Sequence, residues 1–482
     1  MTVVFRALAL LLLVVCAVWL PVLWHWQHSR RDVSTADVVY WLVVLPALLF
    51  AACVLLRWAW RAVVLPGMAQ ASPNASPAPA QAPGPNAPAD ARAGSRPALL
   101  LASAVHLPGA TGVEALDEAL REQTVQPGPD AELTNHEGLP LHTARCELSM
   151  DVVAHDPAIA QASPRTARAL ATLMSVMQDL AAGWPVRPAA EGDLPAVRLL
   201  VHLPDEVAGA ERESAHAWLQ AQAPAWLEGI ARVVEVWLHG GPGVGLWQHA
   251  ESVLAVLERE RRPDLLLVAA AQSELDPDLL DRWDTEQRLF DAQRAPRGRM
   301  AGEGAAALLV ASASWARQGG VRGEASNALL EPASAAVLAC LHRAVRTERS
   351  QPVDAPGRVN SEALERTMSA VLAAQGLPPE GVQALCCDVD RHGVRNGELF
   401  AAVIARLPHL DAIQDVRALA AGCGHQGTVG LLANVALAAH GVAQSGADDS
   451  DRPSPCLVLH LDDPRWRLGL LVSAPEPSPV SV

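Results

Sequence analysis

The sequence predicts an α/β domain whose helices cover both faces of a sheet, placed behind a membrane anchor and a linker. Three observations carry this prediction. Two long uncharged runs occupy the first 65 residues, and a Pro/Ala-rich tract follows them. Beyond residue 97, apolar runs of strand length alternate with amphipathic runs of helix length, which is typical of a sheet packed between helices.

The charge of the chain is acidic and unevenly placed. Its formal net charge is −15, all 37 basic residues are arginine, and half of the 482 residues are hydrophobic. Because the first 65 residues carry five Arg and two Asp, the remainder is at about −18. Such a surface repels phosphate backbones, which argues against nucleic-acid binding. The eight cysteines form no disulfide framework, which favours buried thiols in a reducing compartment.

The first 65 residues predict a two-helix membrane hairpin. Residues 7–24 and 38–56 are free of charge, and each run is long enough to cross a bilayer as a helix. Tryptophans cluster at the expected ends of both spans, where amphipathic rings favour the interface. A signal peptide is the alternative for the first run, but no Ala-x-Ala site follows it. The arginine count on each side favours a cytoplasmic location for the large C-terminal part.

Residues 66–97 form a Pro/Ala-rich tract. Proline removes amide donors and fixes φ, so neither a helix nor a sheet can propagate through it. We expect a disordered, extended tether between the anchor and the rest of the chain. A proline-rich ligand for an aromatic groove is the alternative, but the tract lacks a repeated, charge-flanked P-x-x-P pattern.

The rest of the chain predicts strands and helices in alternation. Strands are expected at 98–105, 197–202, 233–238, 265–271 and 385–389, and helices at 113–122, 211–223 and 247–261. The strand at 265–271 contains almost no polar residue, which indicates burial on both faces of the sheet.

Two histidines in the C-terminal third follow separate chain segments, each beside glycine where the backbone must turn tightly. His392 precedes Gly393, and His425 follows Gly424. Such imidazoles can act as general acids, general bases or oxyanion donors when a nucleophile is present. Alternatively, they are structural residues that form hydrogen bonds across the middle of a sheet.

These segments resemble a β-ketoacyl synthase (thiolase-like) domain. The glycine-flanked histidines are similar to the two histidines of that family, and residues 302–310 are similar to the turn and strand that close its first half. The resemblance implies a pseudo-duplicated, layered α/β fold. Its first half would lie at 98–320 and its second at 321–476, before a tail at 477–482.

The resemblance also implies an active site that this chain lacks in part. In the family a catalytic cysteine caps a helix, where the helix dipole lowers the pKa of the thiol. The equivalent stretch here, residues 239–247, contains neither Cys nor Ser. The family's lysine stands five residues before the second histidine, where this chain has Ala420. We therefore expect His392 and His425 to be vestigial and the chain not to be an enzyme.

Other candidate sites are less well supported by the sequence. A metal site that combines His425 with neighbouring cysteines lacks a C-x-x-C or an H-x-x-x-H pair. Residues 240–245 are a candidate phosphate-binding loop, but no Gly-Lys-Ser/Thr follows and the spacing fits no dinucleotide fingerprint. Acidic pairs such as Asp462 and Asp463 are expected to be solvated loop charges. We therefore expect no metal and no cofactor.

The order of anchor, tether and enzyme-like domain resembles the type VI lipase adapter proteins of Gram-negative bacteria. The resemblance implies a protein of the bacterial inner membrane that binds a secreted phospholipase effector and helps to load it onto the secretion-spike protein. Two alternatives stay open. One is an altered, membrane-tethered condensing enzyme that acts on acyl chains, and the other is a structural or regulatory component without an effector client. A homodimer, which condensing enzymes often form, is also left open.

Overall fold

The computed structural model describes residues 96–475, apart from short gaps. The gaps are residues 149, 151–155, 157–158, 160–161, 187–193, 205, 208, 292–293, 297, 318–336, 354, 356–358, 391–392 and 448–453. The described residues all belong to one compact unit, Pro88–Val482. The predicted membrane spans at 7–24 and 38–56, nearly all of the linker and the tail at 477–482 lie outside the described residues. No described helix has both the length and the apolar character that crossing a membrane requires.

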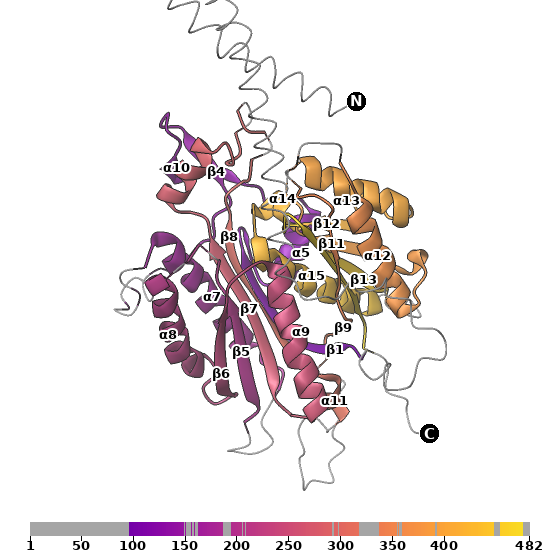
Figure 1. Cartoon of the computed structure of the whole chain (residues 1–482). Helices are drawn as coiled ribbons and strands as arrows, with labels where there is room; N and C mark the ends of the chain where they lie inside the picture. The colour runs from indigo at the N-terminus through magenta and orange to yellow at the C-terminus, as the bar shows by residue number, and fades with distance from the viewer. Residues whose placement is uncertain are drawn as a thin grey trace, which may run out of the picture. The chain divides into compact units, whose positions relative to one another are not determined.

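The first half of the described chain alternates strands with helices (Figure 1). In chain order it contains β1 (Ala98–Leu107), β2 (Ala110–Thr111), α5 (Val113–Arg121), β3 (Gly128–Thr134), β4 (Pro140–Thr143), α7 (Pro164–Ala182), β5 (Ala196–His202), α8 (Gly209–Trp226), β6 (Arg232–His239), α9 (Gly243–Glu260), β7 (Leu265–Ser273), α10 (Pro277–Thr285), β8 (Glu303–Ala311) and α11 (Ala313–Arg317). The strands predicted at 98–105, 197–202, 233–238 and 265–271 are confirmed as β1, β5, β6 and β7.

The second half follows the same alternation. It contains β9 (Ala339–Leu341), β10 (Val345–Glu348), α12 (Glu362–Gln375), a 3₁₀ turn (Pro379–Gly381), β11 (Ala384–Cys387), α13 (Gly393–Arg406), β12 (Val416–Ala418), α14 (Leu419–Cys423), α15 (Gly427–Ala447), β13 (Cys456–His460) and β14 (Trp466–Ser473). The strand predicted at 385–389 is confirmed as β11, which begins one residue earlier and ends two residues earlier.

One large mixed sheet runs through both halves. Its strand order is β12-β11-β13-β14-β9-β1-β8-β7-β5-β6, with β10 added to β14 and β2 to β1. From either outer edge inward, the first two pairings are parallel and the next two antiparallel, and β1 and β9 join the halves as an antiparallel pair. The two halves therefore repeat one topology, as a pseudo-duplicated domain requires. The predicted boundary at 320/321 falls inside the gap at 318–336.

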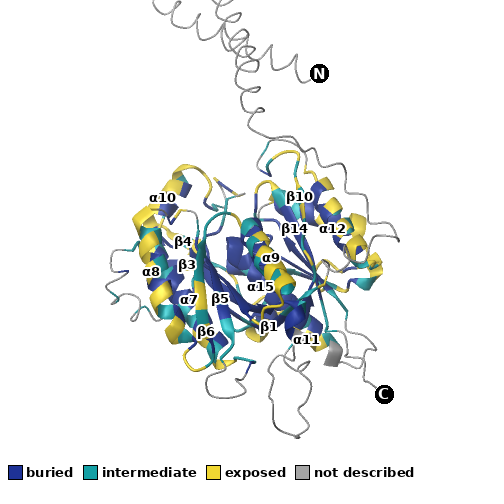
Figure 2. Ribbon diagram, turned by 60° about the horizontal axis from the view of Figure 1, so that its bottom comes forward, coloured by how far each residue is buried: buried dark blue, intermediate teal, exposed yellow. Residues whose placement is uncertain are grey.

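The apolar residues divide into layers on either side of this sheet. Helices α7 and α8 pack with the outer face of the first-half strands. Helices α12 and α13 pack in the same way on the second-half strands. Between the halves lies a central core that contains α9, α15 and α5 with the inner faces of both sets of strands (Figure 2). Burial on both faces explains why β7 and β8 are apolar along almost their whole length.

The two central helices bring their N-termini to the same region of the domain. Helix α9 follows β6, and α15 follows the short α14. Because α15 is surrounded by protein, every residue from 427 to 439 is buried, and 16 of the 21 residues of the helix are Ala, Val, Leu or Gly. The convergence of these two helix ends places the polar pocket described next.

Candidate functional site

A polar pocket of about 220 Å³ lies at the N-terminal ends of α9 and α15. Residues from both halves line it, although they are far apart in the sequence. The lining comprises Arg165, His202, Pro204, Glu206, Gly241, Pro242, Gly243, Gln272, Glu274, Leu279, Trp283, Arg299, His425, Gly427, Thr428, His460, Asp462, Asp463 and Pro464. The unpaired amide groups of the first helical turns give such a place a positive potential.

Helix α9 starts earlier than the sequence predicted. The helix was expected from residue 247, because the glycines before it favour a turn, but it begins at Gly243. Pro242 stands at the N-cap and supplies no side-chain cap, while its carbonyl accepts a 2.8 Å hydrogen bond from the Gly245 amide. A Cβ on Gly243 would lie 3.0 Å from His460 Nε2 and 3.3 Å from Thr428 Oγ1. The first residue of α9 must therefore be small for these two side chains to approach it.

His425 lies between two carboxylates in this pocket. Its Nδ1 is 2.5 Å from Glu274 Oε1, and its Nε2 is 2.7 Å from Asp462 Oδ1. Burial opposes the charged imidazole, but Asp462 and Glu274 outweigh that effect and raise the pKa of His425 to about 10. At neutral pH His425 is thus an imidazolium that donates from both nitrogens and cannot act as a base. It links Glu274 of the first half to Asp462 of the second half.

The position of Asp462 corrects a prediction from the sequence. Asp462 and Asp463 were expected to be solvated loop charges. Instead, Asp462 pairs with His425, and although burial opposes ionisation, that pairing holds the pKa of Asp462 well below its ordinary value. Asp463 is also buried, and its Oδ1 accepts hydrogen bonds from the Arg465 and Trp466 amides. The turn between β13 and β14 folds back toward the centre of the domain, which no local pattern in the sequence indicates.

A second histidine, which the sequence did not indicate, faces the same pocket. His460 ends β13, is 1% exposed, and forms a short contact from Nδ1 to Asp388 Oδ2. The other oxygen of Asp388 accepts a 2.7 Å hydrogen bond from the Leu461 amide. Burial opposes protonation of His460, but Asp388 outweighs it and raises the pKa of the imidazole. The Nε2 atom of His460 is buried and has no hydrogen-bond partner in the described part of the chain.

Two further polar groups complete this side of the pocket. His202 Nε2 lies 2.8 Å from the Gly241 carbonyl oxygen, which can only accept, so this nitrogen carries the hydrogen. Thr428 Oγ1 lies 3.2 Å from the same nitrogen and therefore accepts from it. The hydroxyl hydrogen of Thr428 remains available for another acceptor.

The other residues singled out in the sequence have different outcomes. His392 lies outside the described residues. Ala420, in the position of the family's lysine, is buried in the five-residue helix α14 and carries only a methyl group. The described cysteines are all free and buried, and burial raises the pKa of the Cys423 thiol to about 12. Within the described residues, no group of three or more His, Cys, Asp or Glu side chains is placed to hold a metal ion.

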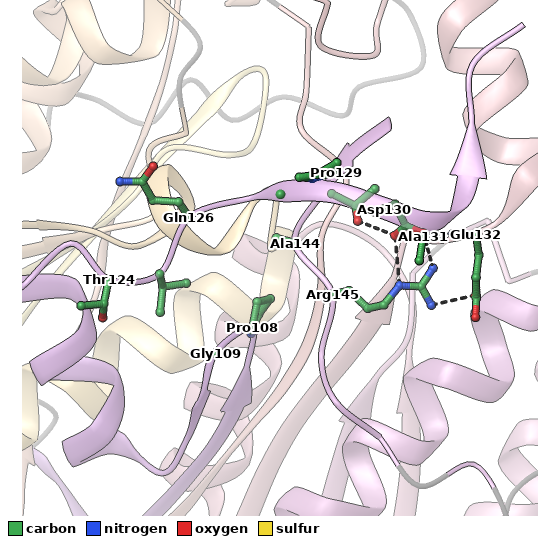
Figure 3. Close-up of a pocket in the computed structure, with 13 residues that line it drawn as sticks. Pro108, Gly109, Thr124, Gln126, Pro129, Asp130, Ala131, Glu132, Ala144 and Arg145 are labelled. Atoms are coloured by element: carbon green, nitrogen blue, oxygen red, sulfur yellow. Dashed lines mark hydrogen bonds and ion pairs between the residues drawn. The ribbon is translucent and has the colours of Figure 1, made fainter. Parts of the chain in front are cut away.

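A larger hollow of about 600 Å³ lies elsewhere, along β3 and the loop before it (Figure 3). Its charged groups are already paired with one another. Asp130 accepts hydrogen bonds from Thr143 at 2.6 Å and from two Arg145 nitrogens at 2.9 and 3.0 Å, while Arg145 also contacts Glu132. Burial opposes ionisation, but the hydrogen bonds from Arg145 and Thr143 outweigh it and lower the pKa of Asp130 to about 2. The smaller pocket, with the unpartnered Nε2 of His460, is therefore the better candidate site.

Comparison with known proteins gives a result for structure only. No protein-family model and no curated protein matches the sequence. The ishigamide ketosynthase/chain length factor has 17% identity and a TM-score of 0.53, and the match covers 78% of this chain and 99% of that one. The ketosynthase from module 6 of the bacillaene synthase of Bacillus subtilis 168 has 10% identity and a TM-score of 0.54, over 80% and 73% of the two chains. The fold is that of a ketosynthase.

A third match agrees with these two. An oxazolomycin ketosynthase domain of Streptomyces albus JA3453 has 13% identity and a TM-score of 0.52, over 80% of this chain and 75% of that chain. The thiolase-like architecture expected from the two glycine-flanked histidines is thereby confirmed. At such low identity the similarity concerns the ketosynthase fold and not the activity.

Proposed function

We propose that this ketosynthase-fold domain binds other molecules and does not condense acyl chains. The first residue of α9 carries this proposal. Condensing enzymes place a catalytic cysteine at the N-terminus of a helix, and the corresponding stretch of this chain begins α9 with a glycine. A side chain added at Gly243 would meet His460 at 3.0 Å, so the pocket has neither a thiol nor ready space for one at this position.

The histidine that resembles the family's second histidine supports the same proposal. His425 is held between Glu274 and Asp462 and stays protonated at neutral pH. A group in that state cannot take a proton from a nucleophile or a substrate. The family's lysine is replaced by Ala420, and the chain contains no lysine that could substitute for it.

For the biological role, we propose an adapter that binds a secreted phospholipase effector and helps to load it onto the type VI secretion spike. The support is the order of anchor, tether and enzyme-like domain in the sequence. The net charge of about −18 beyond residue 65 also favours a client with a basic surface. We propose the inner membrane as the location, with the described domain in the cytoplasm.

The adapter role is tested by affinity purification of the tagged 482-residue chain from its native host, followed by mass spectrometry. We expect a secreted lipase to be recovered in stoichiometric amount, and its recovery to fall as salt is raised, because the complex joins opposite charges. Recovery of no secreted effector would contradict the adapter role.

The absence of condensing activity is tested separately on the purified chain. Incubation with acyl thioesters of N-acetylcysteamine should leave the intact mass of the protein unchanged, because the helix-capping nucleophile is missing. An acyl adduct that forms on the wild-type protein would contradict the non-catalytic proposal. It would favour instead the alternative of an altered condensing enzyme.

A further inference from the structure

We propose that the pocket between α9 and α15 is a binding site for the carboxylate group of a small ligand. This inference goes beyond the proposed adapter role and does not depend on which client is bound. It rests on three observations: an orphaned buried imidazole nitrogen, two helix N-termini that meet at one pocket, and a lining whose charges are nearly balanced.

The orphaned nitrogen is Nε2 of His460. The opposite nitrogen of the ring donates to Asp388, and the Asp388 carboxylate favours the doubly protonated ring. In the doubly protonated ring, Nε2 carries a hydrogen, and this nitrogen lies at the pocket without a hydrogen-bond partner in the described part of the chain. Leaving such a donor unsatisfied in a buried position costs about 1–3 kcal/mol, and more when the group is charged. A ligand that supplies an acceptor oxygen would remove this cost.

Other donors face the same space. The Thr428 hydroxyl, in the first turn of α15, accepts from His202 and keeps its own hydrogen for a ligand. Gly243 starts α9 without a side-chain cap, so the first amides of that helix have no intrahelical acceptor. His460 Nε2 and Thr428 Oγ1 both lie within 3.3 Å of one point, the position that a Cβ on Gly243 would take. The absence of that Cβ keeps the space between them open.

The charges around the pocket favour a ligand with one negative charge over a ligand with two. The carboxylates are already engaged: Glu274 and Asp462 hold His425, Asp388 holds His460, and Asp463 accepts two backbone amides. Glu206 lies 3.6 Å from Arg165. Arg165, Arg299 and the imidazolium of His425 also line the pocket, and Asp388 raises the pKa of His460 there. The lining holds four acidic side chains, Glu206, Glu274, Asp462 and Asp463, against Arg165, Arg299, His425 and His460. It therefore has no excess positive charge for a dianion such as phosphate, which would be held less well than a monoanion. A monoanion, held by the helix ends and His460, fits this balance.

The size and the remaining lining limit the rest of the ligand. A volume of about 220 Å³ corresponds to roughly seven water molecules at about 30 Å³ each. Leu279, Trp283 and Pro204 supply apolar surface next to the polar groups. A short aliphatic stem or the last residue of a polypeptide meets these limits. The carboxylate could thus belong to a free small acid or to the C-terminus of a partner chain.

The test measures carboxylate binding to the purified 482-residue chain by isothermal titration calorimetry. Propionate represents a free small acid, and N-acetyl-Ala-Ala, with a free or an amidated terminus, represents a chain end. Binding of propionate would assign the site to a small acid. Binding of only the free-carboxylate peptide would assign it to a partner's C-terminus. Binding of neither probe would overturn the proposal and leave the pocket to water.

A matched pair of glycine variants locates the site. Gly243→Ala places a methyl group between His460 and Thr428 without touching the His460–Asp388 pair, and should weaken binding about 10- to 100-fold. Gly245→Ala, two residues further along the same helix, adds a methyl group beside His239 and should leave the affinity unchanged. Equal affinity for wild type and Gly243→Ala would overturn the proposal.

A second variant covers the case in which Gly243→Ala does not fold, which circular dichroism would show. Thr428→Val keeps the shape of the side chain but removes the hydroxyl donor. It should weaken binding about tenfold. Unchanged affinity in Thr428→Val, together with a folded protein, would exclude this pocket as the carboxylate site.

Discussion

The two halves of the domain repeat one strand order but close their edges differently. The second half ends at β12, a strand of three residues whose Arg417 forms an ion pair with Asp117 of α5. The first half ends at β6, a strand of eight residues that has no strand on its outer side within the described residues. One edge is therefore short and covered, whereas the other is long and open.

The two central helices also differ in how much of their surface is buried. Helix α15 is enclosed by both halves, and its residues from 427 to 439 are all buried. Helix α9 buries only one side (Figure 2). Val256 of this helix is 37% exposed. The second half thus contributes the more deeply enclosed of the two central helices.

In each half a buried ion pair joins the last strand to a helix, but the strand supplies the acidic residue in the first half and the basic residue in the second. In the first half, Glu303 of β8 pairs with Arg168 of α7. In the second half, Arg467 of β14 pairs with Glu398 of α13, and Arg349 contacts the same carboxylate. Arg467 is fully buried, whereas the side chain of Arg168 is 15% exposed. We therefore expect the second half to depend more strongly on its ion pair, because water cannot replace the lost partner.

The largest predicted effect on stability comes from removing the charge of the buried glutamate in the second half. Glu398→Gln should lower the free energy of unfolding by about 5 kcal/mol, because it leaves the Arg467 guanidinium buried without a counter-charge. Glu303→Gln should cost less, about 1–3 kcal/mol, because water can reach Arg168. Urea denaturation monitored by circular dichroism measures both values.

A surface pair supplies the control for these two variants. Glu362 is 69% exposed beside Arg366, so Glu362→Gln should change the free energy of unfolding by less than about 0.5 kcal/mol. Equal losses for Glu398→Gln and Glu303→Gln would show that the two halves rely on their buried pairs to the same degree.

The next effect concerns the contact between the halves and its pH dependence. His425→Gln should destabilise the protein by about 3 kcal/mol at neutral pH, because Glu274 and Asp462 lose the cation between them. The folded-state pKa of His425 is raised, so its stabilisation is fully present below about pH 6.5 and is lost as the pH rises toward about 10. Wild-type stability should therefore fall across that window. Urea denaturation at neutral and alkaline pH measures the change.

The variant itself should lack this contribution to the pH dependence. The control is His136→Gln, at a histidine that is 55% exposed and pairs with Asp284, where the loss should stay below about 1 kcal/mol. A wild-type profile that is flat from pH 6.5 to 10 would contradict the assignment of His425 as a buried imidazolium.

The alternation of apolar runs was enough to predict the layers of the fold. The strand predicted at 265–271 is observed at Leu265–Ser273, because a strand that is buried on both faces must be apolar throughout. The predicted start of α9 at residue 247 was wrong, because the glycines at 243 and 245 normally favour a turn. In this fold the close approach of His460 and Thr428 requires glycine at residue 243, a tertiary constraint that local pattern cannot show.

The candidate site was predictable only in part. His425 stood out because glycines flank it, and the structure places it in the pocket. His460 ends an ordinary apolar strand, so nothing in its neighbourhood distinguishes it from a core residue. Its partner Asp388 lies 72 residues earlier in the chain. Their pairing depends on β11 and β13 being neighbours in the sheet, which is known only once the topology is known.

The last prediction concerns the open edge of the first half, where a substitution should change assembly but hardly change stability. An exposed strand edge pairs readily with another strand, and we propose that a second copy of the chain covers β6 in a homodimer. Val234 of this strand is 41% exposed, so Val234→Asp should change the free energy of unfolding by less than about 0.5 kcal/mol. The same variant should shift the dimer to monomer, because it places like charges near the symmetry axis. Ile404→Asp, at a 72% exposed site on α13, should leave the dimer intact. Light scattering coupled to gel filtration distinguishes these states, and a monomeric wild-type protein would show that the open edge stays unpaired.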